Sequence, residues 1–138
     1  MSQVIVALDG ISPQRALALA AELSPLQMKG LWGFKIGHEM TNQGEAWIQA
    51  LRSHGKVFVD LKFHDIPNTV ESAVRWLATL QVDLATVHIS TGRTTLNRVA
   101  DLGVGILGVS LLTSTLSEEC LRVYGGSPQD VLQTLFHE

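Results

Sequence analysis

Residues 56–69, KVFVDLKFHDIPNT, carry the strongest structural signal in this chain. The stretch begins as a short run rich in β-branched and aromatic residues, which is typical of a strand. Three charged side chains then follow at the end of the run, namely Asp60, Lys62 and Asp65. Beyond them, apolar residues recur at the helical spacing i, i+3, i+4 and i+7, at Val70, Ala73, Val74 and Leu77. The stretch therefore predicts a strand, a polar loop and an amphipathic helix.

The same strand–helix unit recurs along the whole chain. Strands are predicted at residues 3–9, 31–37, 56–62, 83–89 and 105–111, and their starts lie 28, 25, 27 and 22 residues apart. Each interval is long enough for a strand and a crossover helix. Ser12 and Ser127 each precede a proline, a pattern that predicts a capped helix start. Five βα units predict an α/β domain over residues 1–138 with a parallel sheet.

Two architectures are compatible with five such units. A doubly wound sheet of flavodoxin type fits a length of 138 residues well. A (β/α)₈ TIM barrel needs about 200 residues, so the chain would supply only its first five units. Length favours the doubly wound sheet, and the polar residues at the strand ends must decide between the two.

Composition narrows the class of function. The chain has 10 Lys and Arg against 13 Asp and Glu, a net charge of −3, which disfavours nucleic-acid and membrane partners. Its one cysteine, Cys120, excludes an internal disulfide and a cysteine-based zinc cluster. The run at residues 4–8 lacks the basic flank and the length of a signal peptide or membrane span. We therefore expect a soluble, cytoplasmic protein.

Charged residues gather where the predicted strands end. Both architectures bind ligands at the carboxyl ends of their strands. Asp9 ends the first strand, Lys35 lies late in the second, and Asp60 and Lys62 share one face of the third. These four residues and Asp65 are predicted to form an array of alternating charge. A set of structural ion pairs is the alternative interpretation of each residue taken singly.

Taken together, these motifs resemble the orotidine 5′-phosphate decarboxylase family. Asp60-x-Lys62-x-x-Asp65 resembles the signature of its superfamily, and the following Ile-Pro-Asn-Thr at 66–69 resembles the decarboxylases themselves. Three further segments match in order and spacing: residues 7–9, 34–40 and 111–114. The resemblance implies a TIM barrel, represented here by strands one to five and their helices. The family's phosphate-binding loops follow strands seven and eight, which lie outside these units.

The resemblance also implies an activity, the conversion of orotidine 5′-phosphate to UMP and CO₂ in pyrimidine biosynthesis, without a metal or other cofactor. In that reaction Lys62 would protonate C6 and Asp60 would oppose the substrate carboxylate. Asp9 would bind a ribose hydroxyl, and Lys35 would bridge the ribose and the array. Catalytic roles thus fall to Lys62, Asp60, Asp65 and Lys35.

A homodimer with shared active sites is implied as well, in which Asp65 and Thr69 reach the partner subunit. Thr113 would meet the pyrimidine edge. The remaining binding residues implied by the motif are Leu61, Phe63, His64, Ile66, Pro67 and Asn68. His88 is interpreted as a core histidine.

Two other functions stay open. One is a sugar-phosphate enzyme of the same superfamily, such as 3-keto-L-gulonate 6-phosphate decarboxylase or hexulose-phosphate synthase, which would require magnesium. The other is a non-catalytic half-barrel that assembles with another chain.

Overall fold

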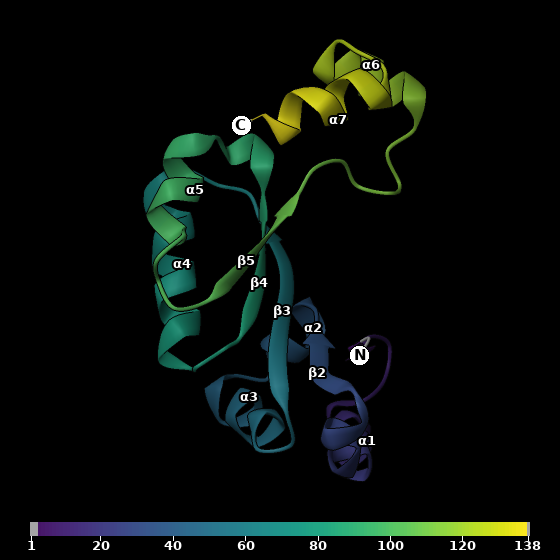
Figure 1. The fold of residues 1–138 in the computed structure, drawn as a ribbon, viewed down its shortest axis with the longest axis vertical. Helices are drawn as coiled ribbons and strands as arrows, with labels where there is room; N and C mark the ends of the chain where they lie inside the picture. Colours follow the sequence, from purple (N-terminus) through teal and green to yellow (C-terminus); the bar gives the residue numbers. More distant parts are fainter. Residues whose placement is uncertain (1–2, 138) are drawn as a thin grey trace.

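A five-stranded parallel sheet forms the centre of the computed structural model, which describes residues 3–137. Helices and 3₁₀ turns connect successive strands (Figure 1). In chain order the elements are β1 (Val4–Ala7), α1 (Pro13–Leu23), η1 (Ser24–Lys29), β2 (Leu31–Ile36), α2 (His38–Thr41), α3 (Glu45–Arg52), β3 (Lys56–Phe63), α4 (Pro67–Thr79), β4 (Leu84–His88), η2 (Ile89–Thr91), α5 (Arg93–Val99), β5 (Gly105–Val109), α6 (Ser117–Tyr124) and α7 (Pro128–Phe136).

The order of the strands decides between the two predicted architectures. The sheet runs β1-β2-β3-β4-β5, and every neighbouring pair is parallel. A flavodoxin-type sheet would place its second strand at the edge and its first strand inside. Sequential order with a crossover after each strand is the arrangement of a TIM barrel. The prediction of five barrel units is confirmed, and the doubly wound alternative is wrong.

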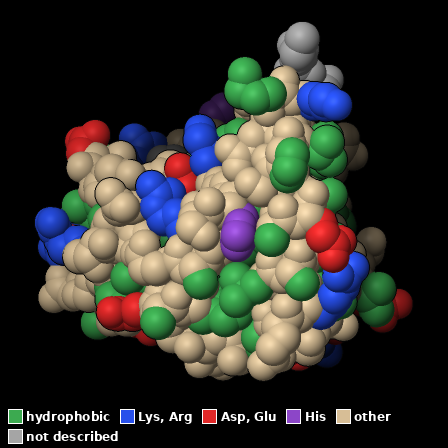
Figure 2. All heavy atoms as spheres, turned by 90° about the horizontal axis from the view of Figure 1, so that it is seen from below, with side chains coloured by type: hydrophobic (Ala, Val, Ile, Leu, Met, Phe, Trp, Pro, Cys, Tyr) green, Lys and Arg blue, Asp and Glu red, His purple; other side chains and the backbone are tan. Residues whose placement is uncertain are grey.

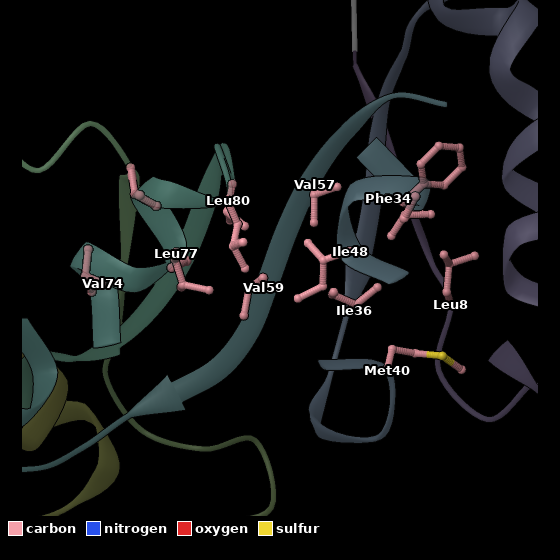
Figure 3. Close-up of a cluster of buried hydrophobic side chains, with 14 of the residues drawn as sticks. Leu8, Phe34, Ile36, Met40, Ile48, Val57, Val59, Val74, Leu77 and Leu80 are labelled. Carbon is pink, nitrogen blue, oxygen red and sulfur yellow. The ribbon is translucent and has the colours of Figure 1, made fainter. Parts of the chain in front are cut away.

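The hydrophobic core lies on one face of this sheet. Phe34 pairs in register with Val57, and Ile36 pairs with Val59, so all four side chains point the same way. They are fully buried against helix residues such as Leu77. Figure 3 shows Ile48 of α3 and Val74 and Leu77 of α4 beside these strand residues. The helices therefore cover this face, and the opposite face carries the polar side chains.

Helix starts follow the predicted capping signals. The Ser12 hydroxyl accepts a hydrogen bond from the N–H of Arg15, and Pro13 occupies the first turn of α1. Ser127 does the same for α7, where its hydroxyl accepts from the N–H of Asp130. The side-chain oxygen replaces a partner that the first-turn N–H groups lack. Both predicted starts are confirmed.

The last two helices lie apart from the sheet. Figure 1 shows α6 and α7 beyond the end of β5, joined to it by an extended segment. They pack on each other through a small cluster of Cys120, Val131 and Leu135, next to Ile89 and Leu111. Leu116, Leu121 and Val123 remain exposed on this pair.

The surface mixes charge and apolar side chains. Figure 2 shows, on the face seen from below, Lys and Arg side chains scattered among Asp and Glu side chains and hydrophobic areas. Within the described part of the chain, none of the helices has both the length and the hydropathy that a membrane-spanning segment needs.

Candidate active site

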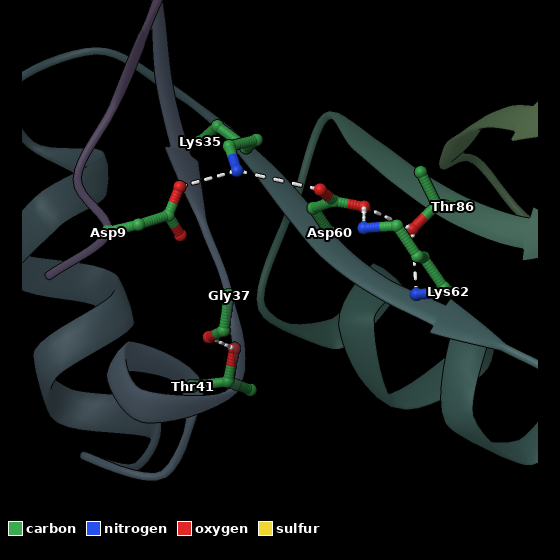
Figure 4. A network of polar contacts seen from close by, with 7 residues as sticks. All are labelled: Asp9, Lys35, Gly37, Thr41, Asp60, Lys62 and Thr86. Atoms are coloured by element: carbon green, nitrogen blue, oxygen red, sulfur yellow. Dashed lines mark hydrogen bonds and ion pairs between the residues drawn. The ribbon is translucent and has the colours of Figure 1, made fainter. Parts of the chain in front are cut away.

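Four of the predicted residues converge at the carboxyl ends of β1, β2 and β3. Nζ of Lys35 lies 2.6 Å from Oδ2 of Asp9 and 3.5 Å from Oδ2 of Asp60. Nζ of Lys62 lies 2.9 Å from Oδ1 of Asp60. The charges thus alternate as Asp9, Lys35, Asp60 and Lys62, and Figure 4 shows the array extending across the three strands.

Asp60 is the centre of this array and its least exposed member, with a side chain that is 15% exposed. Burial alone would raise the pKa of its carboxyl group. Hydrogen bonds from Lys62 and Thr86, with the charges of Lys62 and Lys35, outweigh burial and hold that pKa below its ordinary value. Asp60 is therefore anionic at neutral pH.

Lys35 is held in the opposite charge state. Burial by itself would lower the pKa of its ammonium group. The hydrogen bond and charge of Asp9, together with the charge of Asp60, reverse that effect and keep the pKa above its ordinary value. Lys35 therefore remains a cation between two carboxylates.

Two glycines, Gly33 and Gly37, permit close contacts around β2. A Cβ atom at Gly33 would lie 2.1 Å from the carbonyl oxygen of Lys56, so only glycine lets β2 approach β3 at this point. A Cβ atom at Gly37 would lie 3.1 Å from Oδ1 of Asp9. Gly37 therefore leaves room for the Asp9 carboxylate, which pairs with Lys35.

The local shape of β3 differs from the regular strand that was expected. Val59 of β3 pairs with Ala85 of β4, and Phe63 pairs with Val87. Between these two pairs, β3 therefore contains more residues than β4. Lys62 has a φ of 50°, in the left-handed region. Asp60 and Lys62 do meet as predicted, but through this irregularity and not through simple alternation.

Comparison with known proteins identifies the family of this chain. The model of the "Orotidine 5'-phosphate decarboxylase / HUMPS family" matches residues 2–137. This chain belongs to that family. Among its relatives, the orotidine 5'-phosphate decarboxylase of Sodalis glossinidius is 42% identical, with 94% of this chain covered and 54% of the relative. That of Nitrosospira multiformis is 38% identical, covering 96% of this chain and 57% of the relative. The chain spans about half the length of these curated relatives.

Solved structures of the family share the fold. The crystal structure of the orotidine 5'-phosphate decarboxylase from Lactobacillus acidophilus superposes with a TM-score of 0.79 at 29% identity. The match covers 98% of this chain and 65% of that structure. A second one, from Methanocaldococcus jannaschii, has a TM-score of 0.78 at 20% identity, which supports the fold alone.

Two residues expected at the decarboxylase-type site lie away from the array. The Asp65 carboxylate accepts a hydrogen bond from the N–H of Ile66 at 2.6 Å, and it forms no ion pair with any other described residue. The predicted array of five residues is therefore wrong for a single chain, because the Asp65 carboxylate forms its hydrogen bond within its own loop. Thr113 occupies the exposed turn between β5 and α6 and has no hydrogen bond to the array within residues 3–137.

The other residues of the family motif separate into two groups. Leu61 and Phe63 pack against the hydrophobic core, so their side chains leave the polar face. Ile66 precedes α4 and is exposed, and Pro67 starts that helix. Thr69 is exposed within α4, and Oδ1 of Asn68 accepts from Arg98 of α5. Within the chain, these loop residues face solvent or a neighbouring helix.

Histidines form a second cluster beside the array. The rings of His64 and His88 stack with centroids 4.8 Å apart. His88 is 8% exposed and its Nδ1 has no hydrogen-bond partner among the described residues. Burial, followed by the charges of His64 and Lys62, lowers the pKa of His88. The expected core histidine is confirmed as buried, but its ring is not fully hydrogen-bonded.

One functional candidate was absent from the sequence-based set. Thr86 of β4 donates its hydroxyl hydrogen to Oδ1 of Asp60 at 3.0 Å and accepts from the N–H of Lys62 at 2.8 Å. Threonine is common in β-strands, so a threonine within an apolar strand does not by itself indicate a functional role. Only its position two residues before His88, on the polar face of the neighbouring strand, indicates contact with Asp60. Among residues 3–137, no group of three His, Cys, Asp or Glu side chains is arranged to hold a metal ion.

Proposed function

We propose that the array of Asp9, Lys35, Asp60 and Lys62 is the catalytic centre of an orotidine 5'-phosphate decarboxylase. The observation that carries the proposal is the alternation of charge at the strand ends, with Asp60 between two lysines at 3.5 and 2.9 Å. Relatives that bear this name share the family and 38–42% of their aligned residues. The product would be UMP, with release of CO₂.

The proposed chemistry follows from the two charges that flank the reacting carbon. The Asp60 carboxylate opposes the substrate carboxylate, and this repulsion is relieved as CO₂ leaves. The C6–carboxylate bond breaks and its electron pair stays on C6. The Lys62 ammonium then donates a proton to C6, and Lys62 regains a proton from water. Because these charges stand in place before the reaction, they favour the transition state over the bound substrate, and no cofactor takes part in the proposed steps.

The other residues bind and complete the site. Asp9 would accept a hydrogen bond from a ribose hydroxyl, and Lys35 would bridge the ribose and the array while its charge keeps Asp9 and Asp60 ionised. Thr113 would contact the pyrimidine edge. Asp65 and Thr69, which are exposed in this chain, would enter the site of a second subunit in a cytoplasmic homodimer. The absence of a contact between Asp65 and Lys62 within one chain is compatible with that arrangement.

The family model also covers sugar-phosphate enzymes, and substrate choice separates the two functions. The test uses a full-length protein, by which we mean a chimera in which residues 1–137 replace the matching segment of the Sodalis glossinidius enzyme. The purified full-length protein is incubated with orotidine 5'-phosphate or 3-keto-L-gulonate 6-phosphate, each with and without a chelator, and released CO₂ is measured. We expect CO₂ and UMP from the nucleotide, with no effect of the chelator. Turnover of the sugar phosphate alone, or loss of activity with the chelator, would contradict the proposal.

A further inference from the structure

The backbone between Asp60 and Lys62 needs support from outside β3. The β3–β4 ladder is interrupted between Val59 and Phe63, so the usual interstrand hydrogen bonds are lost there. Lys62 also adopts a φ of 50°, a conformation that residues with a Cβ atom seldom occupy. Such a conformation persists only where the surroundings hold it.

Thr86 provides that support, and the chemistry of the groups fixes the direction of its hydrogen bonds. The backbone N–H of Lys62 can only donate, so the Thr86 hydroxyl oxygen, 2.8 Å away, must accept. The single hydroxyl hydrogen is then left for the Asp60 carboxylate, which can only accept, at 3.0 Å. Thr86 is 6% exposed, so water has little access to replace either bond.

These bonds close a ring on Lys62. The path runs from the Lys62 N–H to the Thr86 hydroxyl, on to Oδ1 of Asp60, and back to Nζ of Lys62 at 2.9 Å. Oδ1 of Asp60 accepts hydrogen bonds from both Thr86 and Lys62. Oδ2 is therefore the oxygen that faces Nζ of Lys35, at 3.5 Å. The Thr86 hydroxyl therefore determines both the backbone that carries the Lys62 ammonium and the rotation of the carboxylate beside it (Figure 4).

We propose that Thr86 is a positioning residue of the decarboxylase site, which orients Lys62 and Asp60 without contacting the substrate. This inference rests on the proposed function of the array. It assigns a specific role to a buried β4 side chain whose neighbours Ala85 and Val87 only pack in the core.

Three variants of the full-length protein test the role. Thr86→Val keeps the shape of the side chain and removes the hydroxyl, Thr86→Ser keeps the hydroxyl, and Thr86→Ala is a second variant without it. For each, kcat and KM for orotidine 5'-phosphate are measured, and the Asp60 carboxyl group is titrated by ¹³C NMR. Unfolding by urea shows whether each variant is folded.

We expect kcat of Thr86→Val and Thr86→Ala to fall on the order of 100-fold, because the proton donor is misplaced, while KM changes little and Thr86→Ser keeps most of the activity. The pKa of Asp60 should rise in the two variants without the hydroxyl and not in Thr86→Ser. If either folded variant retains kcat and the Asp60 titration of the wild type, the positioning role is wrong. If the wild type releases no CO₂ but the Asp60 titration shifts as expected, the proposed function fails and the role of Thr86 in the array stands.

Discussion

Nζ of Lys62 lies 2.9 Å from Oδ1 of Asp60, although the strand that carries both residues is irregular between them. In a regular strand, residues two apart point the same way but are separated by a full pleat repeat. The left-handed backbone at Lys62 turns its ammonium back onto the preceding carboxylate. In the proposed reaction, this geometry holds the proton donor next to the carboxylate that opposes the substrate.

Replacement of this ammonium should abolish turnover and leave the fold intact. In full-length protein we expect Lys62→Ala to lower kcat for orotidine 5'-phosphate by several orders of magnitude, because the substitution removes the proposed proton donor. The side chain is 41% exposed, so loss of its ion pair should change the free energy of unfolding by about 1 kcal/mol or less. Steady-state kinetics and urea unfolding measure the two effects.

Lys29→Ala is the matched control for that substitution, since Lys29 is an exposed lysine at the end of η1, away from the array. It should keep wild-type turnover. Near-normal turnover of Lys62→Ala would exclude Lys62 as the proton donor.

A shared active site predicts complementation between two inactive variants. Lys62→Ala and Asp65→Ala are each expected to be inactive at full length. If Asp65 acts in the partner's site, a mixed dimer has one site with both lesions and one site with neither. Mixing should therefore restore up to about a quarter of wild-type activity when subunits exchange at random and half of the dimers are mixed, with one intact site in each.

Mass spectrometry of the mixture shows whether mixed dimers form. Mixed dimers without any recovered activity would show that Asp65 serves the site of its own chain, although its carboxylate binds the N–H of Ile66 in this structure.

The core should respond far more strongly than the surface to loss of side-chain volume. Leu77 of α4 is fully buried, so Leu77→Ala should lower the free energy of unfolding by about 2–5 kcal/mol. Met28 in η1 is 94% exposed, and Met28→Ala should change it by about 0.5 kcal/mol or less. Urea unfolding monitored by circular dichroism compares the two. Equal effects would mean that the interface between α4 and the sheet is not the core of the folded protein.

Sequence reasoning predicted the framework of this molecule better than its local detail. All five strands were predicted, because buried parallel strands consist of nearly continuous runs of apolar residues. Length wrongly favoured a doubly wound sheet, and only the strand-end residues indicated a barrel. The pairing of Lys35 with Asp9 followed from neighbouring strand ends. The irregularity at Lys62 could not be predicted, since nothing in the residues of β3 signals a left-handed lysine.

The surroundings of Asp65 and Thr86 were also not predicted, because they depend on local backbone geometry and on contacts between strands. Asp65 was included in the array as a charged residue just beyond the end of β3, but in its loop the carboxylate accepts a hydrogen bond from the adjacent N–H group of Ile66. Thr86 was overlooked because its role depends on the register between β3 and β4. Contacts across strands that are distant in sequence are the part that a periodic pattern does not contain.

A polypeptide of residues 1–138 by itself should decarboxylate orotidine 5'-phosphate far more slowly than the related enzyme of Sodalis glossinidius. The side chains of Asp9 and Lys62 are 50% and 41% exposed, and water at the array weakens each charge–charge interaction severalfold. β1 and β5 also present open edges, so we expect self-association by light scattering.

The full-length protein, that is, the chimera with the Sodalis enzyme, serves as the comparison, and it should show turnover that Lys62→Ala abolishes. Turnover by the isolated 138-residue polypeptide at the rate of the related enzyme would contradict the prediction, and it would show that an open five-stranded sheet is sufficient for the chemistry.

The stability of the folded chain should depend on pH through the side chain of His88. Burial first, and then the charges of His64 and Lys62, lower the pKa of this side chain in the folded chain. The unfolded chain has an ordinary histidine pKa of about 6.5, so it binds a proton there at a pH at which the folded chain does not. Protonation of His88 therefore has no effect on stability well above pH 6.5, and stability falls as the pH is lowered through that value.

Removal of the titrating ring should remove this part of the pH dependence. Urea unfolding of the wild type and of His88→Gln is compared between pH 8 and pH 5, with His38→Gln, an exposed histidine of α2, as the control. His88→Gln lowers stability at every pH because it alters a buried site, so the slope against pH is the informative quantity. We expect the free energy of unfolding to fall less steeply below pH 6.5 in His88→Gln than in the wild type and His38→Gln. Identical slopes in all three proteins would show that His88 is protonated equally in the folded and unfolded chain, and that its stack with His64 beside Lys62 does not disfavour its charge.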